Sequence, residues 1–147
     1  MIAAATPFMN VPRPEDWEGP FVVAALICGR VDDTLASISF DVLDLRESFE
    51  LPGNGPLKLT GRILLLRFSR GAASAARITT RLIGPEQYFS DRRVAEVVFT
   101  DDTQTVFLRF DLDDLELPHP GRYGFLVRTS TGAVLTWVPF TVTAKGR

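Results

Sequence analysis

The feature that most constrains the fold is the stretch from Leu117 to Val142. A Pro-Gly pair at positions 120–121 precedes an alternating apolar segment, Thr131-Gly132 forms a turn, and a second alternating segment follows. Two alternating segments joined by a short turn that contains glycine are typical of an antiparallel β-hairpin. We therefore expect this hairpin to close a β-sandwich.

Strand signals recur through the rest of the chain, where helical periodicity is nearly absent. The expected strands are Phe21–Val31, Ile38–Val42, Leu57–Phe68, Arg77–Ile83, Val94–Thr100 and Val106–Asp113. With the hairpin they make about eight strands, and the run from Ile63 to Leu66 is apolar on both faces, as in a central strand. Gly84-Pro85-Glu86 predicts the one short helical turn, through Arg93. Short strands at this spacing indicate an all-β antiparallel sandwich.

Length and composition indicate one globular domain. The 147 residues are 46% hydrophobic and 23% charged, with a formal net charge of −2, so no global charge favours nucleic acid or an anionic membrane. Residues 1–19 contain Pro7, Pro12 and Pro14, and this proline density predicts an extended Pro-rich arm. We expect residues 20–147 to form the β-sandwich domain.

Cysteine use and the N-terminal residues predict a cytoplasmic protein. Cys28 is the only cysteine, so no internal disulfide forms, and it lies in an apolar run that predicts a buried, inert thiol. The first residues lack the basic start and apolar run of a secretory signal. No apolar segment reaches the ~18 residues that a membrane span requires, so no membrane partner is expected.

Three segments resemble a known family of small bacterial β-sandwich domains, Ig-like in outline and of unknown function. They are Ala25–Phe40, the stretch from Leu57 to Ile83 with its Gly/Ala tip, and Leu112–Val142 with its Pro-Gly-Arg-Tyr and Val-Pro-Phe-Thr-Val motifs. The resemblance covers about residues 20–143 and implies an Ig-like sandwich. It implies no catalytic residues. The chain departs from the family in its arm and in the 44–56 insertion.

Tyr123 follows the Pro-Gly pair at the start of a late strand. Ig-like sandwiches carry a tyrosine corner there, in which the hydroxyl bonds back to a nearby backbone group. The alternative is a simple inward-facing aromatic side chain. Both interpretations are structural.

No residue pattern predicts catalysis, a cofactor or a metal site. His119 is the only histidine, and zinc sites need several His or Cys ligands. Asp101, Asp102, Asp111 and Asp113 form a possible acidic face. Alternation with apolar residues favours a solvated face, and a calcium site is the alternative.

Charge is unevenly distributed along the chain. Residues 58–93 hold eight basic and two acidic residues, and residues 94–118 hold seven acidic residues and one arginine. Either the two segments neutralise one another across neighbouring strands, or they form faces of opposite sign that bind a partner. This pattern disfavours a nucleic-acid partner, because no aromatic residues interleave the arginines.

The strongest candidates for an interface lie in the last strand and the arm. Pro139 removes a ladder donor, which indicates an edge or bulge. Trp137 alternates with Val138 and Phe140, so it faces outward as an interface anchor or lies under the arm near Trp17. Arg77 and Arg81 complete the possible interface. The sequence thus predicts a non-enzymatic protein-interaction or assembly module that self-associates or binds a protein. The alternative is a small-ligand or calcium-dependent binding sandwich, and an enzyme is a distant third.

Overall fold

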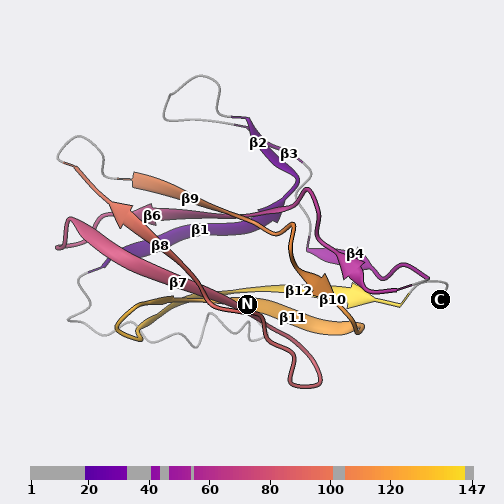
Figure 1. Ribbon diagram of the computed structural model, residues 1–147. Helices are drawn as coiled ribbons and strands as arrows, with labels where there is room; N and C mark the ends of the chain where they lie inside the picture. Colours follow the sequence, from indigo (N-terminus) through magenta and orange to yellow (C-terminus); the bar gives the residue numbers. More distant parts are fainter. Residues whose placement is uncertain (1–18, 33–40, 44–46, 54, 101–104, 145–147) are drawn as a thin grey trace, which may run out of the picture.

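The computed structural model describes residues 19–32, 41–43, 47–53, 55–100 and 105–144 (Figure 1). Every regular element in these ranges is a strand, which confirms the all-β prediction. The described ranges contain no helix of the length and apolarity that a membrane crossing requires. Of the predicted arm, only Gly19 lies within the described residues.

The described ranges contain twelve strands. They are β1 (Phe21–Cys28), β2 (Arg30–Asp32), β3 (Asp41–Leu43), β4 (Ser48–Glu50), β5 (Leu57–Lys58), β6 (Ile63–Ser69), β7 (Ala75–Ile83), β8 (Arg93–Val98), β9 (Thr105–Asp111), β10 (Glu116–Leu117), β11 (Gly121–Thr129) and β12 (Val134–Thr143).

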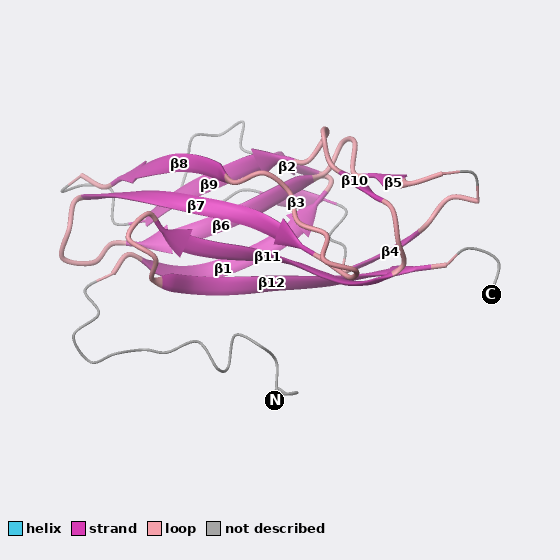
Figure 2. Cartoon of the chain, turned by 60° about the horizontal axis from the view of Figure 1, so that its bottom comes forward, coloured by secondary structure: helices cyan, strands magenta, loops and turns pink. Residues whose placement is uncertain are grey.

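Two main sheets face each other (Figures 1 and 2). One has the order β4-β12-β11-β7-β8 and the other the order β1-β6-β9, and two small ladders pair β2 with β3 and β5 with β10. Neighbours are antiparallel throughout, except that β4 runs parallel to the end of β12. β11 and β12 pair as an antiparallel hairpin, which confirms the prediction of a C-terminal hairpin.

Alternating side chains of both sheets fill the space between them. Tyr123, Phe125 and Val127 of β11 are buried, and Phe140 of β12 stacks on the rings of both aromatic residues at 5.5 and 5.8 Å between centroids. Each fully buried side chain of this size contributes about 1.5–3 kcal/mol of transfer free energy. Removing Phe140 would therefore open the centre of the core.

The prediction of a central strand covered on both faces is confirmed for β6. Leu64, Leu66 and Phe68 enter the core between the sheets, while Leu65 is buried on the opposite face with Cys28. The predicted single strand Leu57–Phe68 is wrong, because a turn separates β5 from β6. In that turn the Arg62 N–H donates to the Leu59 carbonyl at 3.0 Å and Gly61 adopts a φ of +79°.

Two further expectations differ from the structure. The apolar run Phe21–Val31 is split at Gly29 into β1 and β2. The predicted helical turn before Arg93 is also wrong. Glu86 and Gln87 adopt left-handed φ angles of 55° and 63°, and this reverses the chain instead of winding it into a helix. The reversal brings Phe89 back into a bridge with Ile83.

Candidate interaction surface

The register of three neighbouring strands places predicted interface residues on one face of the five-stranded sheet. Leu126 of β11 pairs with Trp137 of β12 on one side and with Arg81 of β7 on the other. The residues next to them in sequence, such as Phe125, Val138 and Leu82, are buried in the core. Because side chains alternate along a strand, the row Trp137–Leu126–Arg81 lies on the face away from the core. We call this the outer face.

Trp137 lies flat on the outer face. A Cβ added to Gly124 would come within 2.1 Å of the indole Cζ2 atom, so the ring occupies the space that a side chain at position 124 would take. Gly124 is buried as a result, and Trp137 itself is half-buried. The register places Trp137 on the face away from the core, which both alternatives for this residue require. The alternative contact with the arm involves Trp17, which lies outside the described residues.

The two predicted arginines share this face at different depths. Arg81 is half-buried, and its guanidinium carbon lies 5.2 Å from the centroid of the Phe89 ring, in cation–π range. Its Nε atom is buried and has no hydrogen-bond acceptor among the described residues. Arg77 lies four residues before Arg81 on the same face of β7 and is exposed. Of these two predicted arginines, one is therefore held by an aromatic ring and one is in solvent.

Pro139 is exposed and pairs with Gly124. Within the described chain β12 meets β4 only at residues 141–143, so at Pro139 it has a ladder partner on one side. A residue without an N–H suits such a position, because no donor is left unpaired there. The proline thus occupies the open part of the last strand.

The strand at the other end of this sheet, β8, pairs only with β7 among the described residues and exposes two valines. The exposed large hydrophobic residues of the described chain are Val23 at 53%, Phe89 at 61%, Val94 at 55% and Val98 at 53%. Three of these four lie in or just before β8. Surface apolar residues scattered singly are ordinary, whereas a group at a sheet edge indicates a contact site. Alternation in the sequence indicated that Trp137 faces outward, but exposure of Phe89 depends on the unforeseen reversal at Glu86.

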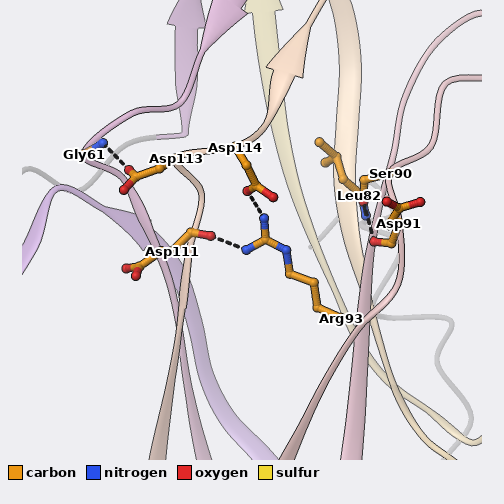
Figure 3. Close-up of polar contacts among 8 residues, drawn as sticks. All are labelled: Gly61, Leu82, Ser90, Asp91, Arg93, Asp111, Asp113 and Asp114. Carbon is orange, nitrogen blue, oxygen red and sulfur yellow. Dashed lines mark hydrogen bonds and ion pairs between the residues drawn. The ribbon is translucent and has the colours of Figure 1, made fainter.

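Of the predicted acidic face, Asp111 and Asp113 lie within the described residues (Figure 3). Asp101 and Asp102 lie outside the described residues. The Asp113 carboxylate accepts a hydrogen bond from the Gly61 N–H at 2.7 Å, which ties the β9–β10 turn to the β5–β6 turn. The backbone carbonyl of Asp111 accepts a hydrogen bond from the Arg93 guanidinium.

Arg93 connects the basic and acidic segments. Its guanidinium donates to the Asp111 carbonyl and forms an ion pair with Asp114. Lys58 and Glu116, which face each other across β5 and β10, form a second pair at 3.9 Å. Neutralisation between neighbouring strands therefore accounts for part of the uneven charge, and the outer face keeps Arg77 and Arg81.

No three His, Cys, Asp or Glu side chains converge on a possible metal position anywhere in the described ranges. The His119 Nδ1 atom lies 3.5 Å from the Glu86 carboxylate, and the side chain is half-buried. Cys28 is fully buried and forms no disulfide. These groups occupy separate parts of the fold and do not form a common site.

Tyr123 forms the tyrosine corner that the sequence suggested. Its hydroxyl donates to the His119 carbonyl at 2.7 Å, while its ring is buried in the core, so both interpretations hold. Burial raises the pKa of Tyr123, and the Glu86 carboxylate raises it further, against the opposing effect of the bond to His119. Burial also raises the pKa of Tyr88, with added repulsion from Tyr123, Asp114 and Glu116.

Comparison with known proteins gives no functional assignment. No family model matches the chain, and no curated protein matches it. Among solved structures the chain is similar to the N-terminal domain of PorA, with 12% sequence identity and a TM-score of 0.29, over 84% of this chain and 98% of that one. A similarity this distant carries no inference about function.

Proposed function

We propose that the protein is a non-enzymatic protein-interaction or assembly module that acts through the outer face, the edge of its sheet and its N-terminal arm. The observation that carries the proposal is the row Trp137–Leu126–Arg81, extended by Phe89. Tryptophan, other aromatic residues and arginine are the residue types enriched in interface cores and hot spots. The partner is a protein, either a second copy or another chain.

We also infer an Ig-like sandwich. The order β1-β6-β9 corresponds to strands A, B and E of that fold, and β12-β11-β7-β8 corresponds to G, F, C and C′. The tyrosine corner at the start of β11 falls on strand F, where Ig-like domains place it. The resemblance to an uncharacterised bacterial family stays a prediction. A cytoplasmic location stays a proposal, supported by the single buried thiol of Cys28.

The calcium-binding alternative has less support. Asp113 is engaged in a turn contact with Gly61, and the described acidic side chains do not converge. Calcium requires six to eight oxygen ligands around one point. The geometry therefore favours the interaction surface over a ligand site.

The proposal is tested with exposed residues whose replacement spares the core. Light scattering of the pure protein reports self-association, and affinity capture from the source cells reports other partners. We expect Phe89→Ser and Arg77→Glu to weaken whichever complex is found. Val23→Ser, which changes a comparably exposed residue on β1 of the other sheet, is the matched control. A monomer without partners, or a complex that Phe89→Ser and Arg77→Glu leave intact, would contradict the proposal.

A further inference from the structure

We propose that the open edge of β8 binds an extended segment of a different protein as an added antiparallel strand, and that this segment carries Lys or Arg opposite Glu96 with apolar residues two positions to either side. The inference rests on the proposed function and specifies its partner. Peptides bind sheet edges in this way through backbone hydrogen bonds, with alternate side chains giving specificity.

Alternate residues of β8 direct their backbone N–H and C=O groups to the open edge, as the binding of an added strand requires. The Phe99 N–H donates to the Ser74 carbonyl at 2.7 Å, in register with the β7–β8 ladder. Since backbone groups in an antiparallel ladder point alternately to either side, the odd-numbered residues of β8 bond to β7. The N–H and C=O groups of Val94, Glu96 and Val98 therefore point to the open edge, where the described chain has no further strand.

The side chains of the same three residues define what the added strand needs. Val94 and Val98 are 55% and 53% exposed, and apolar residues placed opposite them would bury both. Glu96 is exposed and forms no ion pair with any described residue, although Arg77 is its register partner on β7. Opposite charges directly across a ladder stabilise pairing and like charges oppose it. A basic residue therefore belongs opposite Glu96.

The edge is fixed before any partner arrives. At one end, Arg93 binds the Asp111 carbonyl and the Asp114 carboxylate, which ties the first residue of β8 to the β9–β10 turn (Figure 3). At the other end, Phe99 follows the strand and is buried in the core. A strand held at both ends loses little conformational entropy on binding, which favours affinity.

A second copy of this chain is a poor occupant. Two copies of β8 paired over their full length place Val94 opposite Val98 and Glu96 opposite Glu96. The two carboxylates repel each other at the centre of the ladder. Shifted pairings remove this clash but shorten the ladder, because β8 spans only Arg93–Val98. Glu96 therefore acts against self-pairing while selecting a basic partner.

The test uses a fluorescein-labelled peptide, Thr-Val-Thr-Lys-Thr-Val-Thr, and the same peptide with Glu in place of Lys. Fluorescence anisotropy should show the Lys peptide binding about threefold to tenfold more tightly, as expected for exchanging an attractive for a repulsive cross-strand pair. Glu96→Lys should reverse this preference. Glu50→Lys changes an exposed charge on β4, at the opposite end of the sheet, and should leave the preference unchanged.

Amide hydrogen exchange locates the peptide independently. The amides of Val94, Glu96 and Val98 should gain protection on binding, while those of Ala95 and Val97 are already protected by β7. The proposal is overturned if neither peptide binds, or if Glu96→Lys does not reverse the preference for the Lys peptide. So does a β8-dependent dimer in light scattering. If Phe89→Ser still disrupts the natural complex in any of these cases, the proposed function survives and only the edge-strand inference fails.

Discussion

The indole ring of Trp137 covers Gly124 on the neighbouring strand, so that the absence of a side chain at 124 is what lets the ring lie flat. We predict that Gly124→Ala displaces the ring and lowers the free energy of unfolding by about 1–3 kcal/mol, as overpacking does. Urea denaturation measures the loss. The same substitution in a Trp137→Ala background should cost clearly less, and an equal cost in both backgrounds would contradict the contact as its cause.

A second prediction concerns the tyrosine corner. Tyr123→Phe removes the hydroxyl that donates to the His119 carbonyl at 2.7 Å and should lower the free energy of unfolding by about 1 kcal/mol. Tyr88→Phe is the matched control, because the Tyr88 ring packs edge-on against Tyr123 at 5.7 Å and its hydroxyl makes no hydrogen bond with the described residues. Equal urea midpoints for Tyr123→Phe and the unmodified protein would show that the bond adds nothing.

Alkaline pH should destabilise the protein through the same two tyrosines. Their pKa values are raised above 10.0 in the folded state, so the folded protein holds these protons more tightly than the unfolded chain. Their contribution is complete below pH 10 and is lost as the pH rises through the folded-state values. Urea denaturation between pH 9 and 11.5 should show falling stability, and the double variant Tyr88→Phe/Tyr123→Phe should show a shallower fall. An unchanged slope in that variant would assign the loss to other groups.

Asp113 should matter for stability and Asp111 should not. The Asp113 carboxylate accepts the Gly61 N–H at 2.7 Å, so Asp113→Ala should lower the free energy of unfolding by about 1 kcal/mol. Asp111→Ala removes a carboxylate of the same chemistry but leaves the backbone carbonyl that Arg93 binds. Thermal unfolding of both variants checks the difference. A calcium site shared by the two residues would instead make both variants lose a calcium-dependent rise in melting temperature.

Period-two alternation was sufficient to predict the all-β class, the β11–β12 hairpin and the central position of Ile63–Leu66. These features depend on local sequence, because burial on one face leaves a regular apolar pattern. Interruptions were harder to foresee. The turn at Gly61 lies inside a segment that was predicted as one strand, and its geometry depends on Asp113, 52 residues away. The left-handed residues Glu86 and Gln87 give no local signal, since few side chains other than glycine favour that conformation.

The candidate surface was likewise predictable where it depends on local sequence and not where it depends on strand pairing. Alternation around Trp137 indicated an outward ring, but its contact with Gly124 depends on the pairing of two strands. Register also decides that Arg81 and Trp137 share a row, because Leu126 lies between them. The open β8 edge could not be read from the sequence at all, since strand order is a property of the assembled sheets.

The parallel pairing of β4 with β12 joins Ser48 to Thr141 and Glu50 to Thr143. During translation, β4 leaves the ribosome some ninety residues before its partner is made, so this ladder cannot form until the last strand has emerged. The same delay applies to Phe49, whose ring packs edge-on against Phe140. Nascent intermediates should therefore keep β4 and one side of the growing sandwich open to chaperones, and contacts this remote in sequence predict slow closure.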